Sequence, residues 1–317
     1  MAGSITLRMW ESAVDVAAAL ERAFHGLASA VAGASPGWLA LGLALHLLNQ
    51  VARGRGWFAV VRAACPDEPE LRRRDVVAAW VAGAGAGGMF SARGGDAVRV
   101  LLLRRRLPQA GCPLIAGTVV AEGAGELAVG LALLAVALLA GVGPELGAPT
   151  STLLAVGVGI AVLVAIGSRV AVLRRVAARV AMGCTCLRSP ALYARAVLPW
   201  QLVSRVCRFG ALACFLAAFA LPVTPLAVLL VMFAQGSGRL VPFAPAAVGA
   251  TVAMLAASFG PVTGAAVPTA QLAAFFVGMS TVLTVVGATL SLTICVRAAS
   301  WRGLAEALHL RRAPAGA

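Results

Sequence analysis

Apolar segments long enough to cross a membrane recur along most of the chain. The clearest occupy residues 36–52, 113–141, 150–168, 197–221 and 269–296. A membrane-spanning helix needs about 20 mostly apolar residues, because in hydrocarbon every backbone polar group must be satisfied within the protein. Charged residues make up only 12% of the 317 residues, about half the share in a soluble domain. The pattern predicts an all-α polytopic membrane protein with about six to eight membrane segments. It excludes a soluble enzyme and a disordered chain.

The arginines predict how these segments are arranged. All 26 basic residues are arginines, and with 12 acidic residues they give a formal net charge of +14. In a membrane protein such an excess marks cytoplasmic loops and the anionic leaflet, not a nucleic-acid partner. The arginines gather at residues 53–75, 104–106, 169–195 and 297–312. All four groups become cytoplasmic if 76–106 and 225–260 form re-entrant hairpins that enter from opposite faces of the membrane.

The two predicted hairpins suggest an inverted repeat, by which transporters place a site near the membrane midplane. Each hairpin carries a polar, glycine-rich stretch, at 91–99 and at 236–245. We expect irregular backbone there, facing protein or a wet cavity that satisfies its polar groups. The two stretches share a short S-x-R pattern, at 91–93 and at 237–239.

The ends of the chain differ from its middle. Residues 10–31 place apolar side chains at helical spacing among charged ones, which predicts an amphipathic helix lying on the membrane. A poor spanning helix is the alternative. We therefore divide the chain into an interfacial segment, 1–35, a transmembrane domain, 36–300, and a short basic cytoplasmic tail, 301–317.

Several charged residues fall inside the predicted membrane segments, where each costs at least about 2.5–3.5 kcal/mol on insertion scales. Glu122 and Glu126 lie one helical turn apart, and Arg205 and Arg208 fall at a similar depth on another span, so we expect the two pairs to meet. With hairpin residues the set comprises Arg93, Asp96, Arg99, Glu122, Glu126, Arg205, Arg208 and Arg239. Five arginines and three acids leave a net charge of +2, which favours a cavity for a phosphate-bearing ligand. The alternative is a clamp that only holds helices together.

Other chemistries have less support in the sequence. Asp96, Glu122 or Glu126 could serve as the general base of a membrane-embedded transferase, but no nucleophile or nucleotide loop accompanies them. Cys184 and Cys186 form a lone C-x-C with no histidine nearby, which is a poor metal site. We expect no metal and no cofactor, and we expect His46 in the first span to be a packed histidine.

The first hairpin resembles the flippase-like membrane family related to the transmembrane region of lysylphosphatidylglycerol synthases. That family shows an R-x-G-D/E-x-x-R-x-x-L-L pattern, matched here by Arg93, Gly95, Asp96, Arg99, Leu102 and Leu103. Glu122 and Glu126 match an acidic pair on its next helix, although Gly123 stands where an arginine is usual. A later P-x-x-P-G-G-x-G stretch is matched by Pro242, Pro245 and Gly249, but its double glycine is Ala246 and Ala247, and the acid that follows it is Val252. The resemblance covers residues 36–300.

The resemblance implies a multi-pass protein of the bacterial inner (plasma) membrane that binds and translocates a lipid with a phosphate headgroup. Such a lipid is an anionic phospholipid or a polyprenyl-phosphate-type lipid. In the synthases a soluble aminoacyl-transfer domain accompanies this region, whereas the present chain ends shortly after its last predicted span. We therefore expect a flippase-like transporter that is not an enzyme. The alternative is a non-catalytic partner subunit of a lipid-modifying enzyme or a glycosyltransferase, and an embedded transferase is a third reading.

Overall fold

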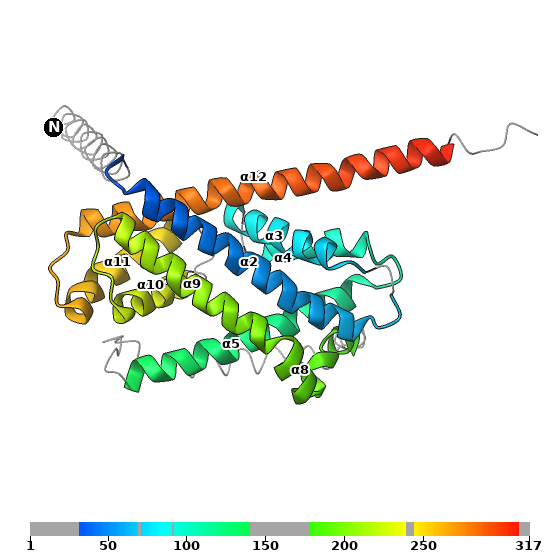
Figure 1. The fold of residues 1–317 in the computed structure, drawn as a ribbon, viewed down its shortest axis with the longest axis horizontal. Helices are drawn as coiled ribbons and strands as arrows, with labels where there is room; N and C mark the ends of the chain where they lie inside the picture. The colour runs from blue at the N-terminus through cyan, green and yellow to red at the C-terminus, as the bar shows by residue number, and fades with distance from the viewer. Residues whose placement is uncertain (1–31, 69–70, 91, 140–177, 239–243, 311–317) are drawn as a thin grey trace, which may run out of the picture. The chain divides into compact units, whose positions relative to one another are not determined.

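The computed structural model of the protein describes residues 32–68, 71–90, 92–139, 178–238 and 244–310 (Figure 1). These residues form helices joined by short turns and contain no strand. Two helical segments, Leu198–Ala218 and Thr269–Ala298, are long and apolar enough to span a membrane by length and composition. The prediction of an all-α polytopic membrane protein is confirmed. The predicted interfacial segment 10–31 and the span 150–168 lie outside the described residues.

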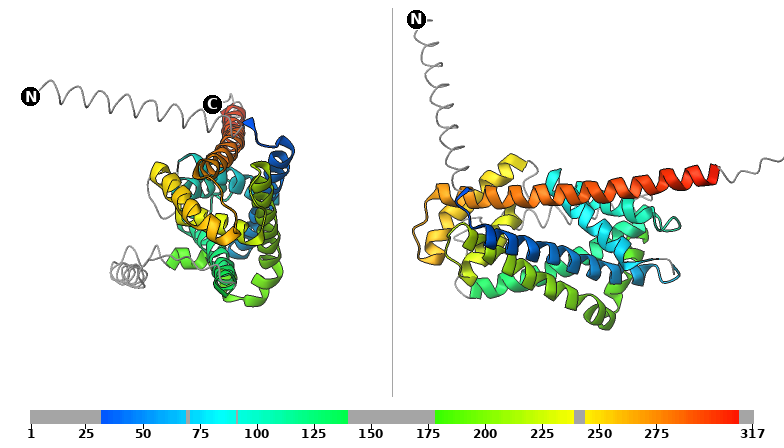
Figure 2. Two further views of the ribbon diagram at one scale, coloured as in Figure 1. Left: turned by 90° about the vertical axis from the view of Figure 1, so that its left-hand side faces the viewer. Right: turned by 45° about the horizontal axis from the view of Figure 1, so that its top comes forward.

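The described helices follow one another in the order α2 (Pro36–Ala64), α3 (Arg73–Met89), α4 (Ala92–Arg104), α5 (Cys112–Leu139), η1 (Thr185–Arg188), α8 (Pro190–Ala196), α9 (Leu198–Ala218), α10 (Pro225–Gly238), α11 (Ala244–Thr263) and α12 (Thr269–Leu310). Both predicted hairpins are present as pairs of packed helices, α3 with α4 and α10 with α11. Figures 1 and 2 show α3 and α4 as the two cyan helices that lie side by side.

Two local predictions are wrong. The first span was expected to end at Arg53, but α2 continues to Ala64 because Trp57, Val60 and Val61 give its second half a fully buried apolar face. The polar stretch 91–99 was expected to be irregular, but α4 begins at Ala92. Gly95 permits this helix, because without a side chain its backbone lies directly against Gly83 and Gly87 of α3. In addition, α12 continues into the predicted tail as far as Leu310.

The chain forms two compact units. Unit 1 combines Met1–Leu45 with Phe209–Val282, and unit 2 combines His46–Arg208 with Leu283–Ala317. Helices α2, α9 and α12 therefore each contribute a segment to both units.

Unit 1 is an apolar helix assembly. Its described residues, 32–45, 209–238 and 244–282, contain no charged side chain and no histidine. The core includes Phe219 and Phe275, whose rings meet edge to face with centroids 5.7 Å apart. Two of its polar side chains bond to backbone carbonyls. The Gln271 side chain donates to the carbonyl of Phe219 over 3.1 Å, and Thr251 of α11 donates to the carbonyl of Ala234 in α10 over 3.3 Å.

Unit 2 contains a core around two tryptophans. Trp57 of α2 and Trp80 of α3 are fully buried, with ring centroids 5.6 Å apart. Glycines bring α3 close to two neighbours, since a side chain at Gly83 would collide with α4, and one at Gly85 would collide with the backbone of Gly287 in α12. Close backbone approach of this kind is typical of packed helices in membranes. The glycines of α3 thereby let α4 and α12 pack directly against its backbone.

Candidate functional site

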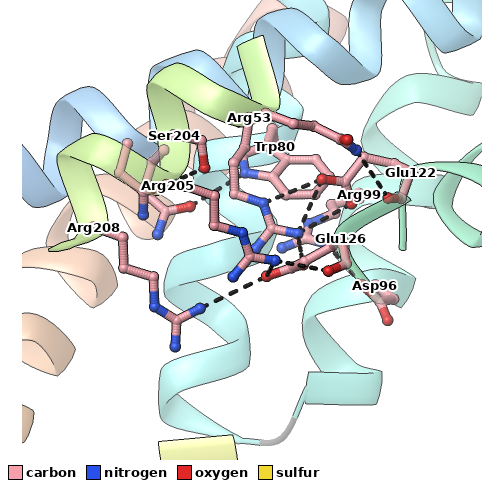
Figure 3. A network of polar contacts seen from close by, with 12 residues as sticks. Arg53, Trp80, Asp96, Arg99, Glu122, Glu126, Ser204, Arg205 and Arg208 are labelled. Atoms are coloured by element: carbon pink, nitrogen blue, oxygen red, sulfur yellow. Dashed lines mark hydrogen bonds and ion pairs between the residues drawn. The ribbon is translucent and has the colours of Figure 1, made fainter. Parts of the chain in front are cut away.

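Charged side chains from four helices of unit 2 meet in one network (Figure 3). We call it the arginine–glutamate cluster. It consists of Arg53 of α2, Asp96 and Arg99 of α4, Glu122 and Glu126 of α5, and Arg205 and Arg208 of α9. Four arginines and three acids give these residues a formal net charge of +1.

Arg53 is the centre of the cluster. Its Nη2 donates to both carboxylate oxygens of Glu122, at 3.0 and 3.1 Å, and its Nε donates to Oε1 at 3.2 Å. The same Nη2 also donates to Oε2 of Glu126. The Glu122 side chain is only 4% exposed. Removing one partner of a buried pair leaves the other charge uncompensated, so this contact is needed for stability.

Glu126 faces three guanidinium groups. Besides Arg53, the nearest nitrogens of Arg205 and Arg208 each lie 3.6 Å from its Oε1. Nη2 of Arg205 also donates to the backbone carbonyl of Glu126 over 2.8 Å. The Glu126 side chain is 24% exposed, far more than that of Glu122. The single carboxylate of Glu126 thus lies next to three positively charged groups on the accessible side of the cluster.

Trp80 provides an aromatic surface for two of the arginines. The Cζ atom of Arg99 lies 3.8 Å from the ring centroid of Trp80, and that of Arg53 lies 4.7 Å away. The indole nitrogen of Trp80 donates to Gln50 Oε1 over 3.2 Å, which fixes the ring. Cation–π contacts of this kind favour arginine over an aromatic face. Trp80 therefore holds Arg53 of α2 and Arg99 of α4 in one place.

Arg99 also pairs with a neighbour on its own helix. Its Nη1 lies 2.8 Å from Oδ1 of Asp96, whose side chain is 48% exposed. The Nε atom of Arg99 is buried and has no hydrogen-bond partner among the described residues. The stem of Arg99 packs on Gly83, where any side chain would overlap it.

Neutral polar side chains join the helices around the cluster. Ser204 of α9 donates to Asn49 of α2 over 2.7 Å. Gln201 of α9 donates to the backbone carbonyl of Glu122 over 3.4 Å and accepts a 3.0 Å bond from the Tyr193 hydroxyl of α8. These bonds fix α5 against α8 and α9, so the position of the two acids depends on several elements.

The structure brings together six of the eight charged residues singled out in the sequence: Asp96, Arg99, Glu122, Glu126, Arg205 and Arg208. Gly95 lies against α3 instead of taking part in the network. The predicted partners of the acids need one correction, since Glu122 pairs with Arg53 and only Glu126 pairs with Arg205 and Arg208. Arg239 and the side chain of Arg93 lie outside the described residues.

Sequence reasoning missed Arg53 because an arginine after an apolar run normally ends a membrane span. A signal was present. His46, Gln50, Arg53 and Trp57 follow one another at intervals of three or four residues and so share one face of α2. The structure uses this face, since Gln50 contacts both His46 and Trp80, and Trp57 donates to Thr118 of α5 over 3.0 Å.

The cysteines of the loop before α8 are packed against α5. Cys184 donates a 3.3 Å bond to the carbonyl of Gly117, and Cys186 is buried in the core of unit 2. Burial raises the pKa of both thiols. In the part of the chain that the structure describes, no three His, Cys, Asp or Glu side chains come together as metal ligands.

The comparison with known proteins identifies the family. The sequence model of the lysylphosphatidylglycerol synthase TM region matches residues 12–291, most of the chain. No significant similarity to a curated protein or to a solved structure was found. The match agrees with the motif in α4 and with the helical architecture, and it supports a membrane role related to lipids. The chain therefore belongs to the lysylphosphatidylglycerol synthase TM region family.

Proposed function

We propose that the protein is a flippase-like transporter that binds the phosphate-bearing headgroup of a lipid in the arginine–glutamate cluster. The observation that carries this proposal is the excess of arginine at the accessible side of the cluster. Arg53, Arg205 and Arg208 face the single carboxylate of Glu126, while Glu122 is occupied by Arg53.

The chemistry of the guanidinium group supports a phosphate ligand. Its planar fork of donors fits two oxygens of a phosphate at once, and it keeps its charge at any physiological pH. Charged groups inside a membrane segment are costly, and functional use is the usual reason that they persist. The proposed ligand is an anionic phospholipid or a polyprenyl-phosphate-type lipid. The acids would orient the arginines or meet a cationic part of the headgroup, with Arg93 and Arg239 as further proposed contacts.

The same proposal includes a place in the cell. The protein would lie in the plasma (inner) membrane of a bacterium, with the arginine-rich loops and the C-terminus on the cytoplasmic side. The two hairpins would gate access to the cluster. The chain would move its lipid without changing it covalently, so that any lipid-modifying enzyme would be a separate partner.

A reconstitution assay tests the proposal. Purified protein in vesicles should move a fluorescent phosphatidylglycerol between leaflets, detected by quenching with an impermeant reductant. The double variant R205Q/R208Q should lose this movement because it removes two of the three guanidinium groups that face Glu126. The double variant R188Q/R195Q removes two exposed arginines, one of η1 and one of α8, and serves as the charge-matched control, with wild-type rates.

The outcomes separate the alternatives. Equal rates for wild type and the double variant would refute this site. A purified protein that moves no lipid but co-purifies with a stable transferase would favour the partner-subunit function. A covalently altered lipid, formed by the purified protein alone, would favour an embedded transferase.

A further inference from the structure

The two acids of the arginine–glutamate cluster are not equivalent. Glu122 is almost fully buried and accepts three hydrogen bonds from Arg53, and its backbone carbonyl accepts another from Gln201. Glu126 is partly exposed and accepts a hydrogen bond from Nη2 of Arg53, but its contacts with Arg205 and Arg208 are ion pairs of 3.6 Å. That distance is too long for a good hydrogen bond. Arg53 therefore binds Glu122 through several hydrogen bonds, whereas the α9 arginines attract the Glu126 carboxylate mainly through charge.

We propose that Glu126 is an internal substitute for the ligand's phosphate: its carboxylate occupies the arginine site in the empty protein and is displaced when a phosphate group binds. This inference rests on the proposed function and adds to it a built-in competitor that regulates binding and release. Glu122 stays paired with Arg53 throughout and keeps the arginine in position.

Electrostatics favours such an exchange. A phosphate beside the Glu126 carboxylate would place like charges together, which is strongly unfavourable in a partly buried site. Phosphate offers more oxygens than a carboxylate and can engage Arg205 and Arg208 through direct hydrogen bonds. The arginines therefore gain contacts on binding only if Glu126 moves away.

The structure also contains space for the displaced carboxylate. Side chains on a helix lean toward its N-terminus, so Glu126 can turn over the residue three positions earlier, which is Gly123. A side chain added at Gly123 would meet no atom within 4 Å. The neighbouring Gly125 is different, because a side chain there would overlap Tyr193 and Gln201. Open space is thus present on α5 on the side toward which Glu126 would turn.

The decisive measurement is the affinity of the purified protein in detergent for dioctanoyl-phosphatidylglycerol. Glu126→Gln keeps the shape of the side chain but removes the competing charge, and should lower the Kd by about tenfold. Asp67→Asn removes one acid of an exposed loop outside the cluster and is the matched control, with a wild-type Kd. An unchanged or higher Kd for Glu126→Gln would overturn the inference, as would equal tightening by both variants.

Two further variants test the exchange itself. Gly123→Val fills the space beside Glu126 and should weaken lipid binding in the wild-type background. The weakening should disappear when Gly123→Val is combined with Glu126→Gln, because no charged group then needs the space. Equal weakening in both backgrounds would show that the valine acts on the fold alone and would contradict the exchange.

The rate of lipid transport gives a second measurement, which would not change in this way if Glu126 had only a structural role. If Glu126 helps to expel the lipid, Glu126→Gln should bind it more tightly and yet move it more slowly at saturating lipid. Faster movement together with tighter binding would contradict a role in release.

Binding measurements with other ligands test this inference separately from the proposed function on which it rests. Dioctanoylglycerol, which has no phosphate, should bind no variant. Inorganic phosphate that binds as well as the lipid, and tightens equally in Glu126→Gln, would support the exchange while refuting a lipid headgroup as the ligand. Folded protein that binds neither phosphate compound, as wild type or as Glu126→Gln, would refute both proposals.

Discussion

Units 1 and 2 have similar helical construction but opposite chemistry. The described part of unit 1 contains no charged residue, and its core is closed by aromatic contacts and by side chains that bond to backbone carbonyls. Unit 2 carries the whole arginine–glutamate cluster together with the tryptophans that support it. Helical packing in this protein therefore does not require buried charge. The charges in unit 2 call for a separate explanation, and the proposed binding of a phosphate headgroup provides one.

The two hairpins show the same difference. In α3 and α4 glycine backbones meet directly, and Asp96 and Arg99 project from the second helix. Between α10 and α11, Thr251 bonds to the carbonyl of Ala234, and a side chain added at Gly249 would meet no atom within 4 Å. The structure thus contains both hairpins from which the inverted repeat was suggested. In the described residues, however, the two hairpins differ in the side chains that they carry.

The largest expected effect is on stability when Arg53 is removed. Arg53→Ala leaves Glu122 buried without its counter-ion, and breaking such a pair costs about 3–5 kcal/mol. Thermal unfolding in detergent should show a large loss. Gln271→Ala in unit 1 removes a single hydrogen bond to Phe219 and should cost about 1 kcal/mol. Similar losses for the two variants would contradict the contrast between the units.

Glycine substitutions compare the two hairpins directly. Gly95→Ala places a methyl group against the backbone of Gly83 and Gly87, so α3 and α4 must move apart. Overpacking of this kind costs about 1–3 kcal/mol. Gly249→Ala enters open space on α11 and should be neutral or stabilising by up to about 1 kcal/mol. Gly95→Ala should therefore lower the melting temperature, while Gly249→Ala should leave it unchanged or raise it, and a larger loss for Gly249→Ala would refute the assigned packing.

A smaller effect is expected at Trp80, where stability and binding should change together. Trp80→Phe loses the bond to Gln50 and weakens the cation–π contacts with Arg53 and Arg99, for a cost of about 1–2 kcal/mol. It should also raise the Kd for dioctanoyl-phosphatidylglycerol. Phe275→Leu perturbs the aromatic pair of unit 1 and should lower the melting temperature without changing that Kd. A change in the Kd for Phe275→Leu but not for Trp80→Phe would contradict the assignment of lipid binding to unit 2.

The sequence predicted much of this fold because hydrophobic length is a local property. The spans near 113–141 and 197–221 and both hairpins were found within a few residues of α5, α9 and the paired helices. The pairing of Glu126 with Arg205 and Arg208 also followed, since depth can be counted along a helix.

The partner of Glu122 could not be found in the same way. Arg53 was placed in a loop because the composition of the chain changes there, and only the burial of Trp57 and the residues after it shows that the helix continues. The helix at 92–104 was missed for a related reason. Glycines usually favour irregular backbone, so the glycines of this stretch argued against a helix. Gly95 is instead explained by the close approach of α3, which is a tertiary contact that the local sequence does not reveal.

The last prediction concerns which side of the membrane the charged loop of unit 2 faces. The native thiols near this loop are poor reporters, because burial raises the pKa of Cys184 and Cys186 and leaves little reactive thiolate near neutral pH. Their labelling by a maleimide in detergent should therefore be slow at pH 7 and accelerate as the pH rises. Fast labelling of Cys186 at pH 7 would contradict its burial.

Exposed positions can then be compared with the wild-type protein, whose native cysteines set the background labelling. Ala191→Cys lies on α8 beside the arginine-rich loop, and Ala266→Cys lies in the uncharged loop between α11 and α12 of unit 1. Because arginine-rich loops stay in the cytoplasm, an impermeant maleimide should label only Ala266→Cys in intact cells. Both variants should react after the membrane is permeabilised. Labelling of Ala191→Cys in intact cells would contradict the predicted orientation. It would place the arginine-rich loop, and with it the proposed entry side of the lipid, outside the cell.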